Sequence, residues 1–291
     1  MIAIITKRFV SLLHLSHSTS LQPSHQEVHL IGPYIHKHQD INQKMRSILV
    51  DWLVEVHFKF RLQPPTLWLC VNIMDRFLNA QLLQRNRLQL LGVASLLVAC
   101  KFEEIFPPEV QDCVYITDRA YSKEEVLAME QMILQTLDYQ LCVPTGYTFL
   151  IRYLNLIHAS EVIKYLSFYY AERNLQEPDS LNLKPSLFAA GAVYAALAQQ
   201  SEHSSLLPHD EIDQTPLWPD ILIEESDYDE SDVLPVAKMI ILHVSEEPVT
   251  TSLRKLVAAK KKYLNDKFHH IADFSLPTFP NKDRRHIPLI E

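Results

Sequence analysis

The sequence predicts an all-α protein built from two helical bundles in tandem. Glycine is rare and proline is common, with 4 and 17 copies, and the prolines fall mainly between apolar stretches. This composition favours helices separated by prolines over sheets, which need glycine-rich turns. An apolar stretch rich in small residues also occurs once in each half of the chain, at 88–100 and 185–200. This recurrence suggests two bundles of similar plan.

The length and composition fit two ordinary globular domains. The chain has 291 residues, of which 47% are hydrophobic and 21% are charged. A chain of this length is expected to form about two domains, with enough apolar mass for two cores. The formal net charge of −8 argues against a surface built mainly to bind DNA or RNA.

The sequence also suggests a reducing compartment. Its cysteines are widely spaced among apolar neighbours and form no C-x-x-C pair, so we expect buried thiols and no zinc site: Cys70, Cys100, Cys113 and Cys142. The apolar start, 1–10, contains Lys7 and Arg8 and does not resemble a signal peptide. The apolar run 88–100 is too short to cross a membrane. We therefore expect a soluble intracellular protein, in nucleus and cytoplasm, with no cofactor, no metal and no membrane contact.

The first expected helix, from about Asn42 to Phe60, is apolar around most of its circumference. Its polar positions are few and lie together: Ser47, Asp51, Glu55 and Lys59. A helix packed on one side of a domain needs an apolar stripe little wider than about 100°. This helix is therefore either surrounded by others or carries a binding surface.

Four more helices complete the first bundle. The second helix is expected to follow Pro64-Pro65 and to end near Asn79, and the fourth is a short helix after Pro107-Pro108. The third starts at Asn86, with a capping box that Gln89 completes. The fifth runs from Ser122 to about Leu137, and Glu125 completes its capping box. The small residues of the third helix allow neighbours to approach closely, so it is expected to be central.

The second bundle is expected to repeat this plan. Helices are predicted near 146–156, 160–175 and 185–200, followed by a polar insertion at 201–217. The acidic run 224–232 leads into a helix at about 231–244, because carboxylates favour the positive end of the helix dipole. A last helix at about 250–265 carries Lys260, Lys261 and Lys262, which we interpret as a solvated face. His269-His270 is expected to lie in the tail and not to bind a metal.

Residues 34–144 closely resemble the cyclin box of the mitotic A/B-type cyclins. The stretches that carry the resemblance are Met45–Leu53, Leu67–Leu78, Leu88–Leu90, Ala99–Glu104, Pro107–Val110 and Tyr115–Asp118. Residues 56–60 look B-type, whereas Glu55 looks A-type. Residues 145–275 resemble the second, more variable cyclin fold, through Trp218-Pro219 and Lys262-Tyr263. The resemblance implies two tandem five-helix cyclin-box folds at 34–144 and 145–275, after an irregular segment 1–33 and before a tail 276–291.

The resemblance implies a regulatory protein and not an enzyme. Such a subunit binds and activates a cyclin-dependent serine/threonine protein kinase in G2/M progression of the cell cycle. Two residues match the family's kinase-contacting lysine and glutamate, Lys101 and Glu130. The full set that the resemblance assigns to kinase binding is Lys101, Phe102, Glu103, Glu130, Leu134 and Leu141. Arg46 and Asp75 match a pair that ties the first helix to the second, and Leu90 matches a core leucine.

A second set matches the family's hydrophobic patch, which docks Arg-x-Leu segments of substrates and inhibitors. It comprises Met45, Ile48, Leu49, Trp52, Glu55, Leu88 and Gln89. The first four follow the i, i+3, i+4, i+7 spacing of one helical face. Apolar residues would accept the leucine and Glu55 the arginine. The same side chains could instead belong to the core.

Three alternatives are considered: two other binding roles and an enzyme. A double-cyclin-fold transcription factor that binds promoter DNA would need a basic surface and a zinc ribbon, and the sequence has neither. The other alternative binding role is that of a scaffold protein that does not bind a kinase. For an enzyme, we find no H-E-x-x-H, no glycine-rich phosphate loop and no metal-spaced cluster.

Overall fold

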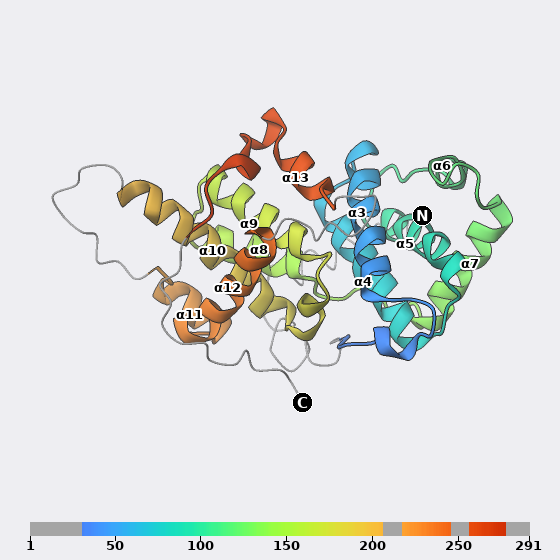
Figure 1. Ribbon diagram of the computed structural model, residues 1–291, viewed down its shortest axis with the longest axis horizontal. Coiled ribbons are helices and arrows are strands. Elements are labelled where there is room, and N and C mark those ends of the chain that lie inside the picture. Colours follow the sequence, from blue (N-terminus) through green and yellow to red (C-terminus); the bar gives the residue numbers. More distant parts are fainter. Residues whose placement is uncertain (1–30, 206–216, 246–255, 278–291) are drawn as a thin grey trace. The chain divides into compact units, whose positions relative to one another are not determined.

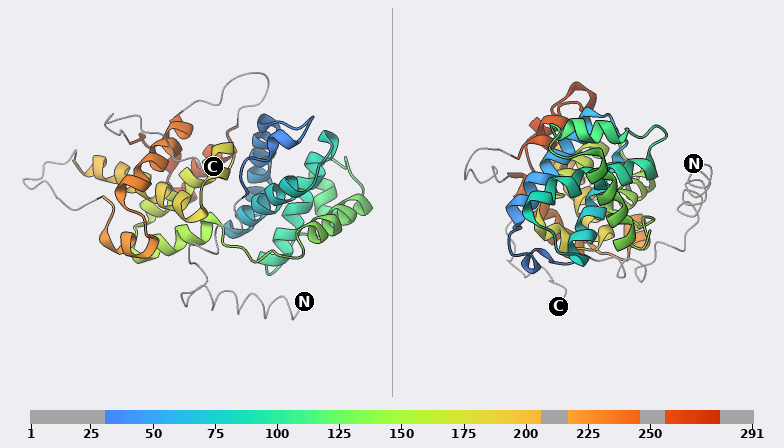
Figure 2. Two further views of the ribbon diagram at one scale, coloured as in Figure 1. Left: turned by 90° about the horizontal axis from the view of Figure 1, so that it is seen from below. Right: turned by 90° about the vertical axis from the view of Figure 1, so that its right-hand side faces the viewer.

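The computed structural model describes residues 31–205, 217–245 and 256–277, with the side chains of 202–205 excepted. Within these ranges every regular element is a helix (Figure 1), which confirms the all-α prediction. The chain divides into two compact units, residues 1–145 and 146–291. The left-hand view of Figure 2 shows the described parts of each unit as a group of helices. The predicted irregular segment 1–33 and the tail 276–291 lie almost entirely outside the described residues.

The described part of the first unit contains the five expected helices. They are α3 (Gln43–Lys59), α4 (Pro64–Ala80), α5 (Leu88–Glu103), α6 (Val110–Ile116) and α7 (Lys123–Thr136), with the short 3-10 turns η2 (Ile35–Lys37) and η3 (Arg85–Arg87). The first residues of α4 are Pro64 and Pro65, where a helix tolerates the missing N–H groups.

Helix α5 is the centre of this unit, as predicted. It packs against α3, α4, α6 and α7, and every residue from Leu90 to Cys100 is buried. Gly92 illustrates why helix α5 needs small residues. A methyl group at this position would lie 2.7 Å from Cδ1 of Leu49, so the glycine lets α3 approach α5 closely.

One of the two predicted capping boxes in this unit is confirmed, and the structure adds a cap at Asn42 that was not predicted. The side chain of Asn42 accepts a bond from the N–H of Met45, and Ser122 and Glu125 form the reciprocal capping box of α7. The predicted box at Asn86 is wrong. Asn86 lies inside η3, and the N-cap position of α5 falls on Arg87, which makes no side-chain capping bond.

The second unit is built around α10. Its helices in the described ranges are α8 (Gly146–Leu156), α9 (Glu161–Asn174), α10 (Pro185–Ser205), α11 (Asp220–Ser226), α12 (Glu230–Ser245) and α13 (Ala258–Tyr263), with the 3-10 turns η4 (Pro178–Asn182), η5 (Asp266–Phe268) and η6 (Ile271–Asp273). Helix α10 packs against α8, α9 and α12. Gly191 repeats the role of Gly92, because a methyl group there would lie 2.5 Å from Cγ1 of Val236 in α12.

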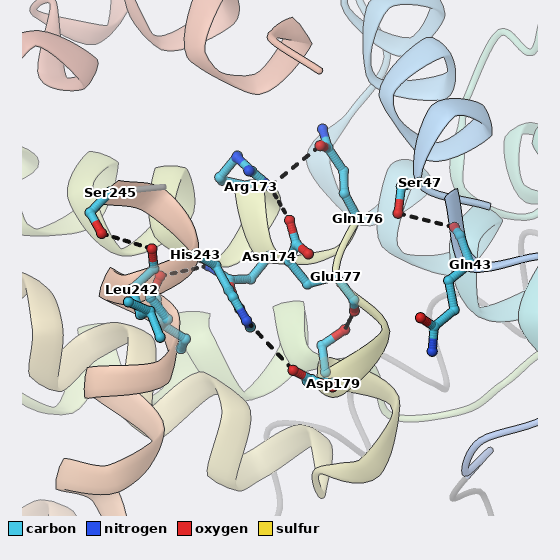
Figure 3. A network of polar contacts seen from close by, with 12 residues as sticks. Gln43, Ser47, Arg173, Asn174, Gln176, Glu177, Asp179, Leu242, His243 and Ser245 are labelled. Atoms are coloured by element: carbon cyan, nitrogen blue, oxygen red, sulfur yellow. Dashed lines mark hydrogen bonds and ion pairs between the residues drawn. The ribbon is translucent and has the colours of Figure 1, made fainter. Parts of the chain in front are cut away.

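Polar side chains tie the end of α9 to α12, as Figure 3 shows. The buried amide of Asn174 donates to the carbonyl oxygens of Tyr170, at 2.9 Å, and of Ile240 in α12, at 3.2 Å. These two bonds fix the orientation of the amide. Its oxygen Oδ1 lies 2.9 Å from Nδ1 of His243, and Nε2 of His243 lies 3.6 Å from Oδ2 of Asp179 in η4.

The second unit differs from expectation in its helix boundaries. Helix α11 was not predicted, and Asp227, with φ +59°, separates it from α12. Trp218 precedes α11, is buried, and donates from Nε1 to the carbonyl oxygen of Tyr228 at 3.0 Å. Helix α10 extends through Ser205, so the start of the predicted insertion 201–217 is helical, and 206–216 lie outside the described residues. Of the last expected helix, 250–255 also lie outside them.

Two side-chain expectations are corrected. Lys262 does not lie on a solvated face with Lys260 and Lys261, because it is buried against Glu172 in α9. Cys142 is exposed, unlike the other three cysteines, because it lies in the connection after α7 and not on a packed helix.

Candidate functional site

Lys101 and Glu130 form an ion pair at the surface of the first unit. Nζ of Lys101 lies 2.6 Å from Oε1 and 2.7 Å from Oε2 of Glu130. Lys101 is in the last turn of α5, and Glu130 is near the middle of α7. The lysine side chain is 42% exposed and the glutamate side chain 12%. The two residues predicted to act together therefore do lie together, and the pair can be reached by a partner from the lysine side.

The other predicted partner-binding residues lie on the same two helices or in the connection after α7. Phe102 and Glu103 follow Lys101 at the end of α5, and Leu134 lies one turn after Glu130 on α7. Leu141 is in the connection that follows α7. All four side chains are half-buried. Apolar and charged residues that are accessible in part thus lie near the pair along the chain, at the end of α5 and in the second half of α7 and its connection.

Two residues that sequence reasoning missed are the most exposed large apolar side chains here. Ile105 is 77% exposed and Phe106 is 90% exposed, directly after α5. Singly exposed apolar residues are common, but two adjacent ones directly after the helix that carries Lys101 form a candidate contact. The signal was present in the sequence. Two bulky apolar residues stand between a helix end and Pro107-Pro108, where no helix can bury them.

The predicted docking patch lies on α3 and the start of α5. Met45, Ile48, Trp52, Glu55 and Gln89 are half-buried, whereas Leu49 and Leu88 are buried. Leu49 packs against α5 at Gly92, one turn beyond Leu88. Leu49 and Leu88 therefore belong to the floor between the two helices, and the other five residues are accessible in part.

Arg46 and Asp75 form a buried pair between α3 and α4. Nε and Nη2 of Arg46 donate to Oδ1 and Oδ2 of Asp75 at 2.8 and 2.7 Å. The hydroxyl of Tyr34 donates to the same Oδ1 at 2.5 Å. Burial, followed by the charge of Asp75, raises the pKa of Tyr34 well above its usual value, so the hydroxyl stays a donor. Leu90 is fully buried in α5.

The described residues offer little for metal or thiol chemistry. They contain no group of three or more His, Cys, Asp or Glu side chains that could hold a metal ion. Burial raises the pKa of the Cys113 thiol to about 12, and it also raises the pKa values of Cys70 and Cys100. Thiols of this kind are poor nucleophiles. None of the described helices has the length and apolar character needed to span a membrane.

Comparison with protein families matches both units. The cyclin N-terminal domain matches residues 17–142, and the cyclin C-terminal domain matches residues 144–277. Similar curated proteins include cyclin-B1-3 of Arabidopsis thaliana, 44% identical over 207 residues that cover 71% of this chain and 47% of the relative. Cyclin-B2-1 of Oryza sativa subsp. japonica is 48% identical over 172 residues, which cover 59% of this chain and 41% of the relative. This chain spans about half the length of the curated relatives it matches.

Solved structures support the same fold. A viral cyclin from herpesvirus saimiri superposes with a TM-score of 0.63 at 19% identity, over 77% of this chain and 96% of that chain. A chain of the yeast RNA polymerase II CTD kinase CTDK-1 complex superposes with a TM-score of 0.54 at 12% identity, over 94% of this chain and 92% of that chain. These likenesses concern the fold, and they confirm two tandem cyclin folds.

Proposed function

This chain belongs to the cyclin family and is B-like, and from this premise we propose that it binds and activates a cyclin-dependent serine/threonine protein kinase. Cyclins are regulatory subunits and not enzymes, which agrees with the prediction from the sequence. We also propose that it acts in G2/M progression, in nucleus and cytoplasm, and that its cyclin boxes occupy 34–144 and 145–275.

The observation that carries the proposal is the accessible pair of Lys101 and Glu130. Its two side chains come from α5 and α7 and meet at 2.6 Å. A lysine ammonium has three donors and a carboxylate has several acceptor sites, so each can bind a partner's backbone group while the pair stays intact. The pair therefore supplies directional contacts, and the apolar side chains around it supply buried area.

The energetics suit a binding surface of mixed character. A partly exposed ion pair contributes little stability to the chain, about 0–1 kcal/mol. A partner that covers it gains charge-assisted bonds but must displace its water, so the pair gives specificity more than affinity. Affinity then depends on burying apolar side chains such as Phe106, each contributing about 1.5–3 kcal/mol when fully covered.

Activation follows from preferential binding to one kinase conformation. A protein kinase is active only when a lysine–glutamate pair and a magnesium-binding aspartate are all in place. A subunit that binds this arrangement better than the inactive one shifts the equilibrium by its difference in affinity. Moving the population from 1:99 to 99:1 takes about 5.5 kcal/mol of difference. A rigid surface on two packed helices can apply such a preference, because it does not adapt to the inactive form.

In addition to kinase binding, we propose that helix α3 carries a docking site for peptide segments. The half-buried Met45, Ile48 and Trp52 form an apolar face, and Glu55 lies one turn beyond Trp52 on that helix. We propose that this face holds Arg-x-Leu segments of substrates and inhibitors.

The test mixes the purified chain with a monomeric cyclin-dependent kinase and measures complex formation and substrate phosphorylation. We expect Lys101→Ala with Glu130→Ala to abolish co-purification with the kinase. The matched control is Arg152→Ala with Glu225→Ala, which removes a similarly exposed ion pair of the second unit. Undiminished kinase binding by the first double variant, or loss of binding by the control alone, would refute the assignment of Lys101 and Glu130 to the kinase contact. Failure of the unaltered chain to bind or activate a cyclin-dependent kinase would refute the proposed function.

A further inference from the structure

Glu104 is the residue at which α5 ends. Its backbone is extended, with φ −89° and ψ 145°, and its N–H donates to the carbonyl oxygen of Cys100 at 2.9 Å. It follows Glu103 directly, so it stands between the charged part of the candidate surface and the exposed Ile105 and Phe106. The direction of the backbone after Glu104 therefore determines where the side chains of Ile105 and Phe106 lie on the surface.

The side chain of Glu104 is bonded to the start of another helix. Its Oε1 accepts a bond from the N–H of Gln63 at 2.8 Å and one from Oγ1 of Thr66 at 2.5 Å. Gln63 is the residue just before α4, and Thr66 is the third residue of that helix, with a buried side chain. One carboxylate oxygen thus links the residue just after α5 to the first turn of α4.

Helix α4 has no side-chain cap of its own. Gln63, its N-cap residue, makes no side-chain capping bond, and the next two residues, Pro64 and Pro65, have no N–H groups. Glu104 accepts the N–H of Gln63 itself and the hydroxyl of Thr66, while the N–H of Thr66 donates to the carbonyl oxygen of Gln63 at 3.1 Å. A carboxylate here also faces the positive end of the helix dipole. Glu104 therefore provides, from the residue after α5, the bond to the N-cap N–H that the glutamate of a capping box usually provides within one helix.

The chain beyond Glu104 is also restricted. Pro107 and Pro108 fix their own φ angles, and each limits the conformation of the residue before it. Ile105 and Phe106 therefore lie between a pinned residue and two prolines. A short segment restrained at both ends has few ways to fold back and bury its apolar side chains.

We propose that Glu104 is a positioning residue for the kinase-binding surface. By capping α4, it fixes the exit of the chain from α5 and so the presentation of Ile105 and Phe106. This inference rests on the proposed function above. It does not require Glu104 to touch the kinase, because Oε1 is already engaged within the chain. A cap with only a structural role would change stability and leave the presentation of these residues unchanged.

The test compares Glu104→Ala, Glu104→Gln and Thr66→Val with the control Asn42→Ala in the full chain. Asn42→Ala removes a cap from the neighbouring helix α3 and leaves Glu104 untouched. Binding to a monomeric cyclin-dependent kinase and amide hydrogen exchange at 104–106 are measured, together with the thermal midpoint. Glu104→Ala is expected to weaken kinase binding about tenfold. It is also expected to speed exchange at 104–106 by roughly tenfold or more.

The remaining variants separate positioning from stability. Glu104→Gln keeps an acceptor oxygen and is expected to restore binding to within about threefold of the unaltered chain. Thr66→Val removes one of the two bonds without changing shape, so an intermediate loss is expected even if Glu104→Ala folds poorly. Asn42→Ala is expected to lower the thermal midpoint while leaving binding and exchange at 104–106 unchanged.

Two results would overturn the inference. One is unchanged exchange at 104–106 in both Glu104→Ala and Thr66→Val, which needs no kinase to observe. The other is an equal loss of kinase affinity in Asn42→Ala and Glu104→Ala at equal thermal midpoints. Failure of the unaltered chain to bind any cyclin-dependent kinase would instead reject the proposed function, and with it the role assigned to Glu104.

Discussion

Lys262 and Glu172 form a buried ion pair inside the second unit, although 90 residues separate them in the sequence. Nζ of Lys262 lies 2.8 Å from Oε1 and 2.6 Å from Oε2 of Glu172, and the two side chains are 6% and 1% exposed. The hydroxyl of Tyr263 donates to Oε1 of the same carboxylate at 2.9 Å. The pair therefore fixes α13 against α9.

The first unit contains the same combination of groups. There the buried carboxylate is Asp75, the cation is Arg46, and the hydroxyl is that of Tyr34. In both units burial, followed by the nearby carboxylate, raises the pKa of the tyrosine well above its usual value. Each tyrosine thus remains a donor at physiological pH, and each carboxylate keeps more than one partner, as buried charges require.

Replacing Lys262 should destabilise the second unit far more than replacing its neighbour. Lys262→Met leaves the Glu172 carboxylate buried without its cation, which costs about 3–5 kcal/mol. Lys261→Met changes an exposed lysine of the same helix and should stay within about 0.5 kcal/mol. Urea unfolding followed by circular dichroism measures both. Equal losses in the two variants would contradict the buried pair.

Arg46 and Asp75 should be strongly coupled in a double-mutant cycle. Arg46→Met strands the carboxylate, and Asp75→Asn strands the guanidinium while keeping an oxygen for the hydroxyl of Tyr34. Each single change should cost about 3–5 kcal/mol. The double variant should cost less than the sum of the two, by about 1–3 kcal/mol, because neither charge is then left alone. Unfolding free energies of the four proteins measure this difference, and strict additivity would rule out the pairing.

The helices of the first unit could be predicted because their signals are local. Asn42 and Ser122 cap the helices that follow them through bonds that span only three residues. Pro64-Pro65 marks the start of α4 in the same way. Such features do not depend on the rest of the fold, so the sequence alone displays them.

The features that were predicted wrongly all depend on residues that lie far away in the sequence or outside the local pattern. Lys262 was assigned to a solvated face because its neighbours are lysines, and only Glu172 in α9 makes burial possible. Asn86 has the right type for a cap, but it lies in the 3-10 turn η3, so the N-cap position of α5 falls on Arg87. Helix α11 is one short acidic segment anchored by the burial of Trp218. No local pattern reveals these partners.

The candidate site was predictable in its members but not in its geometry. The resemblance to cyclins identified Lys101 and Glu130, yet nothing in the sequence shows that their side chains bond to each other, because 29 residues separate them. The same limit applies to Glu104, whose partners Gln63 and Thr66 lie on another helix.

The two helical glycines should respond differently to alanine. Gly92→Ala brings a methyl group against the flexible end of Leu49, at 2.7 Å, which can move aside. Gly191→Ala meets Cγ1 and Cβ of Val236 at 2.5 and 2.9 Å and the backbone nitrogen of Ala237 at 3.2 Å, none of which can move freely. Alanine itself favours a helix over glycine by about 1 kcal/mol.

The net effect should therefore differ in size between the two sites. Gly92→Ala should be nearly neutral, because the gain in helix propensity offsets the displacement of Leu49. Gly191→Ala should destabilise by about 1–3 kcal/mol, as overpacking does. Thermal unfolding of both variants checks the order, and a larger loss at Gly92 would show that α3 and α5 are packed more rigidly than α10 and α12.

The proposed docking face on α3 should bind an Arg-x-Leu peptide through Trp52 and Glu55. Trp52→Ala removes apolar surface for the leucine, and Glu55→Gln removes the charge opposite the arginine; each contact is worth about 1.5–3 kcal/mol. Each variant should therefore weaken binding about tenfold or more in a fluorescence titration. Phe58→Ala is the matched control, because Phe58 is an exposed aromatic residue on the same helix and outside the predicted patch. A peptide with alanine in place of arginine should bind the unaltered chain and Glu55→Gln equally well. If Trp52→Ala binds the peptide as tightly as Phe58→Ala does, Trp52 belongs to the core of the unit and the docking face must be abandoned.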